Sequence, residues 1–270
     1  MLPKDLLKVA KAIQKKGGEQ FKLKSFSASG LKKLGAGAIL GVSRGSSSEP
    51  YLIHLHYSPG KKSKSTKRIC FVGKGVTFDS GGLSMKSPAG MLDMKCDMAG
   101  AASVLGVMHS LSKLPVNKRP AIEVHALIPS VENMVGPDSI KLGDVVETIG
   151  GTTVEITNTD AEGRLILADA LNYSSSIKAD VTVDLATLTG ACIAALGESY
   201  AGLFTEDERL AQECCSASDA SVEKLWQLPI AESEYLKSLD SSVADIKNSA
   251  AKTPPGASIA AIFLKQFVPK

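Results

Sequence analysis

The sequence predicts an α/β fold in which helices cover both faces of a mixed central sheet. Segments of strand character alternate with segments of helical character along most of the 270 residues. Hydrophobic residues make up 44% of the chain and charged residues 22%, which is typical of a globular protein with a sizeable core. The sequence contains no internal repeat and no long linker, so we expect one large domain over residues 1–270.

The first part of the chain begins with a helix and continues with strands. Apolar residues at helical spacing, ended by a pair of glycines, predict a helix over residues 5–16. Residues 20–26 and 51–57 have strand character. Between these strands, residues 27–47 predict a short helix that runs into a glycine-punctuated segment.

The middle of the chain predicts further strands and helices in alternation. Residues 68–73 and 121–131 read as strands, and the small side chains of residues 98–114 suit a helix packed closely against a sheet. Residues 145–157 predict a hairpin that turns at two adjacent glycines. Residues 165–177 predict a helix with apolar residues along its length.

The last part of the chain predicts one strand and three helices. Residues 179–189 read as another buried strand, and residues 190–199 as a helix that follows it. Residues 207–218 and 258–268 complete the set of predicted helices. The chain ends directly after the last of these with no polar tail, which suggests a truncated C-terminal end.

Charge, cysteine content and hydropathy exclude several classes of protein. A net charge of +3 is too weak to predict a nucleic-acid partner, and the basic residues of 60–68 are expected to form a solvated loop. The five cysteines include no CxxC pair and no secretory leader precedes them, which favours reduced thiols in a cytoplasmic compartment. The first helix contains Asp5 and no continuous apolar run, so it predicts neither a signal peptide nor a membrane span.

Two stretches concentrate residues that carry chemistry. The first, "NTDAEGRL", covers residues 158–165, and the second, "VGKGVTFDSGGLSMKSPAGMLDMKCDMAGAA", covers residues 72–102. Asp160 and Glu162 are two residues apart, so in an extended loop their side chains project to the same side. Carboxylates that share a small volume need a positive charge among them. Buried ion pairs and a pair of divalent metal ions both satisfy this need, and the pattern alone leaves the two readings open.

Other catalytic and metal-binding motifs are missing from the sequence. The histidines are scattered without an HExxH motif, and His54 and His56 are expected to be ordinary residues on one face of a strand. The cysteines do not form a structural zinc pattern. The glycines around Lys74 lack the spacing of a P-loop, and no GxSxG elbow is present.

Together, "NTDAEGRL" and "VGKGVTFDSGG", with a later lysine and "CDM", resemble the two motifs of the leucyl aminopeptidase, or cytosol aminopeptidase, family. The likeness extends from about residue 31 to residue 268 and includes "DLATLTGACIAALGESYAGLF". It implies a zinc-exopeptidase-like catalytic domain with metal-dependent aminopeptidase activity. It also implies two divalent ions, zinc or manganese, in each subunit.

The resemblance implies roles for individual residues. The positions that match the family's metal ligands are Lys74, Asp79, Asp97, Asp160 and Glu162. The two that match its catalytic residues are Lys86 and Arg164. Those that resemble its pocket for the first substrate side chain are Met94, Thr187, Leu188 and Gly190.

Each implied role has a chemical reason. A lysine binds a metal only as the neutral amine, so the pKa of Lys74, normally about 10.4, must fall. The two ions lower the pKa of a water toward about 7, which supplies a hydroxide nucleophile. Lys86 is expected to polarise the scissile carbonyl, and Arg164 to hold a bicarbonate ion that acts as general base. The resemblance implies a peptide substrate with a free N-terminus, whose first residue is preferably leucine or another apolar residue.

The sequence departs from the family pattern at both ends. From the resemblance we expect that the family's N-terminal domain is absent or reduced to the first helix, and that a C-terminal segment that completes the core and the pocket in the family is missing. The main alternative is therefore a truncated, catalytically impaired assembly or binding subunit; an endopeptidase or other metal hydrolase is a further possibility. The resemblance also implies a homo-oligomer, a hexamer in the family, located in the cytoplasm. Some relatives also bind DNA, but the weak net charge here gives no support for a nucleic-acid partner, and the hydropathy predicts no membrane partner.

Overall fold

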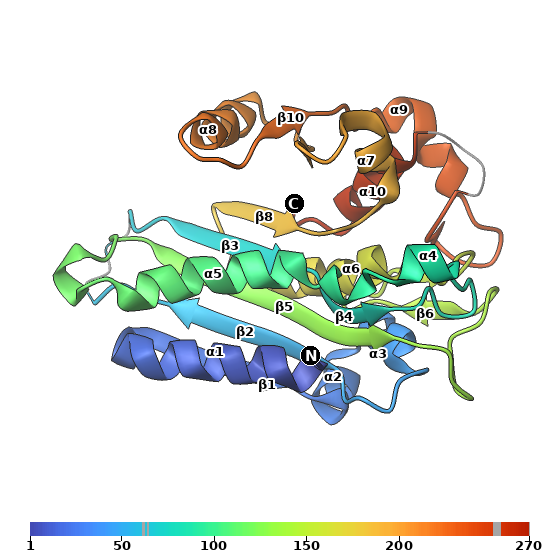
Figure 1. Cartoon of the computed structure of the whole chain (residues 1–270), viewed down its shortest axis with the longest axis horizontal. Coiled ribbons are helices and arrows are strands. Elements are labelled where there is room, and N and C mark those ends of the chain that lie inside the picture. The colour runs from blue at the N-terminus through green and yellow to red at the C-terminus, as the bar shows by residue number, and fades with distance from the viewer. Residues whose placement is uncertain (61–62, 64, 251–254, 270) are drawn as a thin grey trace.

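A computed structural model of the chain describes residues 1–60, 63, 65–250 and 255–269. The basic stretch 60–68, expected to be a solvated loop, lies partly outside the described residues. Figure 1 shows a twisted sheet with helices in front of it and behind it, and a further helical segment beside one of its edges.

The central sheet has six strands and mixes parallel with antiparallel pairs. Its order is β1 (Phe21–Phe26), β2 (Tyr51–Tyr57), β5 (Glu123–Asn133), β3 (Arg68–Gly73) and β8 (Val181–Leu185), and β4 (Gly75–Asp79) pairs with the far end of β5. β2 runs antiparallel to both β1 and β5. β3, β4 and β8 run parallel to β5 or to each other. The predicted mixed sheet is confirmed.

Helices cover both faces of this sheet, as predicted. The helices over one face are α1 (Pro3–Gly17) and α5 (Ala99–Lys113), and those over the other are α2 (Ala28–Leu34), α3 (Gly37–Ser43), α6 (Glu162–Ser174) and α10 (Gly256–Lys265). Successive side chains of a strand point to opposite faces, so Ile53 packs in the core under α1 and α5, whereas Leu52 packs under α3 and α6. The sheet thus separates two hydrophobic cores (Figure 1).

A hairpin joins the carboxyl end of β5 to α6. β6 (Val145–Glu147) and β7 (Thr153–Glu155) pair in antiparallel fashion, which confirms the predicted hairpin, and β11 (Ile246–Lys247) adds to β7 in parallel. Gly151 has a φ of 85°, a left-handed conformation that glycine adopts without steric cost. The hairpin brings the 158–165 motif back to the carboxyl ends of β4 and β5.

The segment after β8 lies along the edge of the sheet, in gold to red in Figure 1. Its elements are α7 (Gly190–Leu196), β9 (Ala201–Leu203), α8 (Glu208–Asp219), β10 (Leu225–Gln227) and α9 (Glu232–Tyr235), followed by β11 and α10. The prediction of a buried strand over 179–189 is wrong: among the described residues β8 pairs only with β3, at the edge of the sheet, and the residues of β8 are partly exposed.

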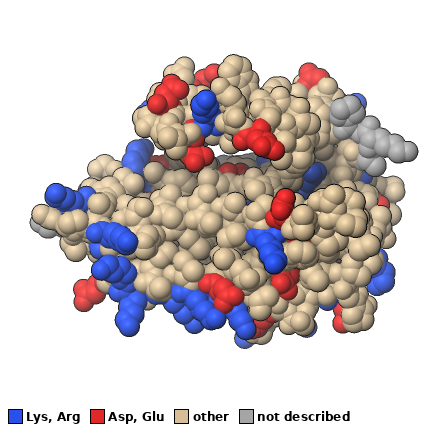
Figure 2. All heavy atoms as spheres, viewed as in Figure 1, with Lys and Arg blue, Asp and Glu red and all other residues tan. Residues whose placement is uncertain are grey.

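The remaining elements are single turns between the larger ones. They are α4 (Pro88–Met91) and the 3-10 turns η1 (Gly18–Gln20), η2 (Met94–Cys96), η3 (Val116–Lys118), η4 (Ser175–Ile177) and η5 (Leu236–Leu239). Lys and Arg side chains gather along the lower edge of the surface in Figure 2, where α1 exposes its lysines. Within the described ranges, no helix is long and apolar enough to cross a membrane.

Candidate metal centre

Lys74 lies at the break between β3 and β4, and the backbone around it is fixed on both sides. Its N–H donates to the carbonyl oxygen of Leu185 at the end of β8, at 3.0 Å. Its carbonyl oxygen accepts from the N–H of Ala101 in α5, at 2.9 Å. The Lys74 side chain is therefore directed into the protein at the carboxyl ends of the parallel strands, and the residue is only 2% exposed.

The ammonium group of Lys74 joins the two sequence motifs. Its Nζ lies 2.7 Å from Oδ1 of Asp97 and 2.9 Å from Oε1 of Glu162. The same Nζ donates to the carbonyl oxygen of Thr187, at 2.8 Å. An ideal Cβ on Gly163 would lie 2.7 Å from Nζ, so any side chain at this position would force Lys74 to shift.

A second lysine joins the other two carboxylates. Nζ of Lys86 lies 2.9 Å from Oδ2 of Asp79 and 2.5 Å from Oδ1 of Asp160. Asp79 is the last residue of β4 and is buried, whereas Asp160 is partly exposed. The side chain of Lys86 is 17% exposed, so this part of the cluster can be reached from solvent.

Three buried carboxylates from three separate segments converge at one point. Asp79, Asp97 and Glu162 each offer one oxygen, and these oxygens all lie within 4.8 Å of one another. Oδ2 of Asp97 is buried and has no hydrogen-bond partner among the described residues. Such an unpartnered buried acceptor is costly for the folded protein unless a cation binds it. The arrangement fits a divalent ion.

The balance of charge points the same way. The four carboxylates of Asp79, Asp97, Asp160 and Glu162 face the two ammonium groups of Lys74 and Lys86. When all six groups are ionised, the negative charges outnumber the positive ones by two. A dication would neutralise this excess. Hard oxygen donors with one amine suit zinc, manganese, cobalt and magnesium alike.

The pKa values of these groups reflect burial of the excess charge. Burial raises the pKa of Glu162 to about 8, although Lys74 acts in the opposite direction. Burial also raises the pKa of Asp97 and of Asp160 above the usual range. For Lys74, burial lowers the pKa, but the charges of Glu162 and Asp97 outweigh this effect and the net shift is upward.

The sequence suggested that Asp160 and Glu162 lie in an extended loop, and this prediction is wrong. Asp160 lies in a turn, where its N–H donates to the side-chain oxygen of Asn158, at 2.9 Å. Glu162 is the first residue of α6. The two side chains therefore contact different lysines, Glu162 meeting Lys74 and Asp160 meeting Lys86.

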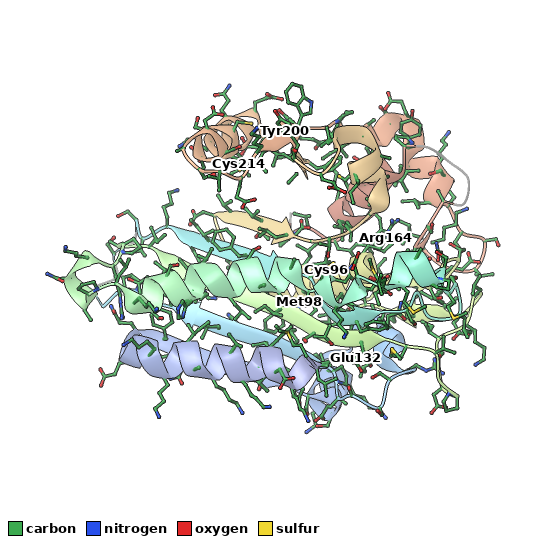
Figure 3. The ribbon with its side chains drawn as sticks, in the orientation of Figure 1. Cys96, Met98, Glu132, Arg164, Tyr200 and Cys214 are labelled. Atoms are coloured by element: carbon green, nitrogen blue, oxygen red, sulfur yellow. The ribbon has the colours of Figure 1, made fainter. Side chains whose placement is uncertain are left out.

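Arg164 lies in the first turn of α6, where the helical segment after β8 meets the sheet (Figure 3). Its Nη1 donates to the carbonyl oxygen of Asn248, at 2.9 Å, and its guanidinium lies 6.0 Å from the ring centroid of Phe263. Burial lowers the pKa of Arg164 to about 10, so the group stays charged at neutral pH. Its Nε is buried without a hydrogen-bond partner among the described residues.

The four residues expected to line a substrate pocket are placed differently from one another. Thr187 supports the cluster directly, since its hydroxyl donates to Oδ1 of Asp97 at 2.7 Å. Met94 belongs to the turn η2, just before Asp97. Leu188 packs against the core, and Gly190 is the exposed first residue of α7.

Sequence reasoning missed the amide side chains that hold the motifs together. Nδ2 of Asn133 donates to Oδ1 of Asp79 at 2.8 Å and to the carbonyl oxygen of Thr159 at 3.0 Å. Asn248 accepts from the N–H of Thr157 at 2.9 Å and donates to the carbonyl oxygen of Asn158 at 2.6 Å. These contacts join residues far apart in the chain, so no local sequence pattern predicts them.

A hydroxyl pair also links the two motif loops. The N–H of Ser84 donates to Oγ1 of Thr159 at 2.7 Å, and the N–H of Thr159 donates to the hydroxyl of Ser84 at 3.1 Å. Oγ1 of Thr159 in turn donates to the carbonyl oxygen of Gly81, at 2.6 Å. The loop that carries Asp79 and Lys86 is thereby fixed against the loop that carries Asp160.

Comparison with known proteins gives consistent results. The catalytic-domain model of the cytosol aminopeptidase family matches residues 1–270. A probable cytosol aminopeptidase of Gloeobacter violaceus is 51% identical over 239 residues, which cover 88% of this chain and 46% of that protein. A probable cytosol aminopeptidase of Synechococcus sp. (strain CC9311) is 48% identical over 248 residues, which cover 91% of this chain and 48% of the relative.

A solved structure is similar over almost the whole chain. The crystal structure of cytosol aminopeptidase from Coxiella burnetii superposes with a TM-score of 0.90 at 41% sequence identity. The match covers 99% of this chain and 56% of that one. The chain thus spans about half the length of the relatives that it matches.

Proposed function

This chain belongs to the cytosol aminopeptidase family, and we propose that it releases N-terminal residues from peptides in a metal-dependent reaction. One observation carries the proposal. Buried oxygens of Asp79, Asp97 and Glu162 converge within 4.8 Å, and one oxygen of Asp97 has no hydrogen-bond partner among the described residues. The geometry supports a cation site, and membership of the family supports the reaction.

In this proposal, the metal ligands are the amine of Lys74 and the carboxylates of Asp79, Asp97, Asp160 and Glu162. Two divalent ions, zinc or manganese, supply Lewis acidity when bound and acidify a water molecule. Asn133 holds the Asp79 carboxylate in position, and Thr187 does the same for Asp97. Such contacts behind the ligands fix the orientation of each carboxylate before substrate arrives.

Lys86 is the proposed electrophile. Burial lowers its pKa, but the hydrogen bonds and charges of Asp160 and Asp79 raise it above the usual range, so it keeps its proton at neutral pH. The side chain is 17% exposed, so its Nζ is accessible to the carbonyl oxygen of a bound peptide. A donated hydrogen bond there stabilises the negative charge that develops on that oxygen.

Arg164 is the proposed site for a bicarbonate ion that acts as general base. The guanidinium is buried and charged, and its Nε has no hydrogen-bond partner among the described residues. A small anion would complete the hydrogen bonding of this group. Arg164 would hold this anion, which would supply a general base when bound.

The proposed metal ions also suggest a source of specificity. A free α-amine in its neutral form would be a ligand for one of them, whereas a blocked N-terminus would not, so a blocked peptide should bind poorly. We propose leucine or another apolar residue as the preferred first residue, next to Met94, Thr187, Leu188 and Gly190. Family membership further supports a homo-oligomer, a hexamer, in the cytoplasm.

Hydrolysis of leucine p-nitroanilide by the purified full chain tests the proposal. We expect cleavage that requires added Mn²⁺ or Zn²⁺, and no cleavage of the N-acetylated substrate. Glu162→Gln should abolish turnover while the far-UV spectrum is retained, and the exposed Glu208→Gln serves as the matched control. Metal-independent cleavage, or cleavage of the N-acetylated substrate, would contradict the proposal. A folded, metal-loaded but inactive chain would favour an assembly or binding subunit.

A further inference from the structure

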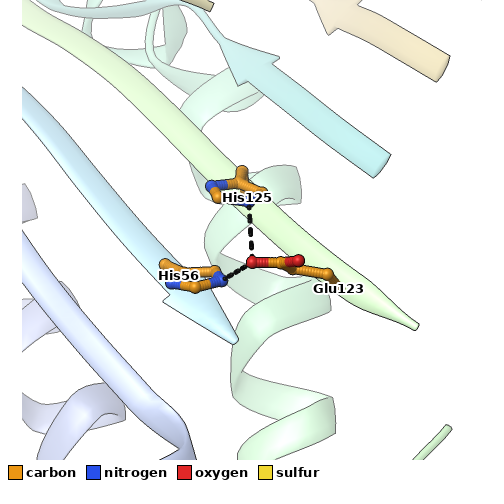
Figure 4. Close-up of side chains that lie close together, drawn as sticks. All are labelled: His56, Glu123 and His125. Atoms are coloured by element: carbon orange, nitrogen blue, oxygen red, sulfur yellow. Dashed lines mark hydrogen bonds and ion pairs between the residues drawn. The ribbon is translucent and has the colours of Figure 1, made fainter. Parts of the chain in front are cut away.

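A second cluster of metal-ligating side chains lies at the opposite end of the sheet. We propose that His56, Glu123 and His125 form a binding site for a transition-metal dication of the zinc type, separate from the candidate catalytic centre. Each residue offers one nitrogen or oxygen, and these atoms all lie within 4.8 Å of one another. Figure 4 shows both imidazole rings directed toward the Glu123 carboxylate.

The strand register explains why these residues meet. β2 and β5 are antiparallel neighbours, and His56 is the direct partner of His125 across the pair. Directly opposed residues have their Cβ atoms about 5 Å apart, on the same face of the sheet. Glu123 precedes His125 by two residues on β5, so its side chain points to that same face. The three side chains are held on two paired strands, which are rigid supports for a site.

The distances match a site that needs only a small adjustment to bind an ion. Oε1 of Glu123 lies 2.7 Å from Nε2 of His56 and 3.6 Å from Nε2 of His125. The two rings are stacked, with centroids 4.2 Å apart and an angle of 11° between their planes. The two imidazole nitrogens and the carboxylate oxygen would supply three ligands to the ion. The fourth coordination position would be open to water, as in many zinc sites with three protein ligands.

His125 is oriented by two further side chains. Its Nδ1 lies 2.9 Å from Nε2 of His54, and Nδ1 of His54 lies 3.3 Å from the hydroxyl oxygen of Tyr173. When His125 donates from Nδ1 to His54, and His54 donates from its own Nδ1 to Tyr173, the lone pair of His125 Nε2 is left facing Glu123. That Nε2 is buried and has no hydrogen-bond partner among the described residues. A metal-binding histidine usually donates its other ring N–H in this way.

The protonation of these histidines is compatible with ligation. Burial is the main cause that lowers the pKa of His54 to about 4 and of His125 to about 3. Both rings are therefore neutral at pH 7, which is the form that binds metals. The sequence suggested that His54 and His56 are ordinary strand residues; their proximity to His125 and Glu123 appears only in the folded sheet.

Neighbouring charges restrict the class of ion. Nε of Arg68 donates to Oε2 of Glu123 at 3.3 Å, and the guanidinium is held by the carbonyl oxygens of Ile177 and Lys178. Arg68 therefore occupies the other carboxylate oxygen and disfavours weakly bound cations. Imidazole nitrogens favour Zn²⁺, Cu²⁺, Ni²⁺ and Co²⁺ over Mg²⁺ and Ca²⁺.

The two sites are far apart but share one helix. Glu123 opens β5 and Asn133 closes it, a span of about 33 Å at about 3.3 Å per residue. Glu162 begins α6 at the candidate catalytic centre, and Tyr173, near the end of α6, contacts His54. An ion bound by His56, Glu123 and His125 would connect β2 to β5.

Copper titration of the full chain, followed by pulsed electron paramagnetic resonance, tests this inference. The candidate catalytic ligands include no histidine, so coupling of Cu²⁺ to imidazole nitrogen distinguishes the second site from the candidate catalytic centre. With up to three equivalents of Cu²⁺, we expect imidazole coupling in the wild type. In His56→Gln the coupling should fall and the affinity of this site should weaken by about 10- to 100-fold. His109→Gln, at an exposed histidine of α5, should match the wild type.

Two results would overturn the inference. One is an absence of imidazole coupling in the wild type at three equivalents of Cu²⁺. The other is coupling of unchanged strength in His56→Gln. His56 is partly exposed, so its substitution should leave the fold intact, and a urea unfolding curve checks this. Because the signal comes from imidazole alone, either result leaves the proposed aminopeptidase function untouched.

Discussion

The ammonium nitrogen of Lys74 lies 2.9 Å from Oε1 of Glu162, and this contact joins two motifs that are far apart in the sequence. Lys74 reaches the site from a break between two strands, and Glu162 reaches it as the first residue of a helix. Gly163 makes the approach possible, because a Cβ there would overlap with the end of the lysine. This contact fixes the side chains of Lys74 and Glu162 relative to each other.

Gly163→Ala should therefore displace Lys74 and impair the proposed aminopeptidase reaction. We expect kcat/KM for leucine p-nitroanilide to fall by about 100-fold, since a shift of about 1 Å at a reacting centre costs that much. Gly106→Ala in α5 is the matched control, because a Cβ at Gly106 meets nothing within 4 Å. The control should keep full activity and gain up to about 1 kcal/mol of stability. Equal activity of the two variants would show that the fit around Lys74 is unimportant.

Proton release on metal binding should reveal the state of Lys74. Although burial opposes it, the charges of Glu162 and Asp97 raise the pKa of Lys74, so the group is protonated before a metal binds. A ligating amine must lose this proton. Calorimetric titration with Mn²⁺ in buffers of different ionisation enthalpy should show about one proton more released by the wild type than by Lys74→Met.

The exposed Lys95→Met is the control for this titration and should release as many protons as the wild type. Identical release by Lys74→Met would remove the lysine from the ligand set.

Asn133 should act as a positioning residue for the metal ligands. Its side chain donates to Asp79 and to the backbone of Thr159, and so holds both motif loops. Asn133→Ala should weaken Mn²⁺ binding by about 10- to 100-fold, as loss of a contact behind a ligand commonly does. Activity should recover at high Mn²⁺ concentration, which a direct catalytic role would not allow. The exposed Asn117→Ala should leave the Mn²⁺ dependence unchanged.

Asp169 should make the stability of the metal-free protein depend on pH. Its carboxylate accepts from the N–H of Ile39 and of Ile149, and burial raises its pKa to about 7 from 3.8. Between these values the folded state holds a proton that the unfolded state has lost, so stability falls as pH rises. From pH 5 to pH 7 this group contributes a loss of up to about 3 kcal/mol, at about 1.4 kcal/mol per pH unit.

Urea unfolding of the chelator-treated protein at pH 5 and pH 8 measures this effect. The wild type should lose more stability over the interval than Asp169→Asn, which cannot ionise. The exposed Asp219→Asn should follow the wild type. If wild type and Asp169→Asn change in parallel, the pKa of Asp169 is not raised.

Local patterns were sufficient to predict much of the fold. Alternation along 51–57 and the glycine pair at 150–151 predicted β2 and the β6–β7 hairpin, which the structure confirms. Burial of strands was harder to predict. The apolar run of 179–189 suggested a buried strand, yet β8 lies at an edge and is partly exposed, because strand order depends on pairings between distant segments.

The candidate centre was likewise only partly predictable from the sequence. Two dense acidic stretches indicated that carboxylates would share a small volume, and the resemblance to the aminopeptidase family selected the five expected metal ligands among them. The contacts that orient them were not predictable: Asn133 and Asn248 act on residues far away in the chain. Likewise, the sequence spacing of His56 and His125 does not predict their contact, because only the register of β2 against β5 makes them neighbours.

We propose above all that the carboxylates of Asp79, Asp97, Asp160 and Glu162 bind two divalent ions side by side. Electron paramagnetic resonance of the full chain loaded with Mn²⁺ tests it most directly, because two Mn²⁺ ions about 3.5–4 Å apart couple through bridging carboxylates. We predict the spectrum of a coupled pair in the wild type and its loss in Glu162→Gln. A wild-type spectrum of isolated Mn²⁺ ions alone would contradict the account.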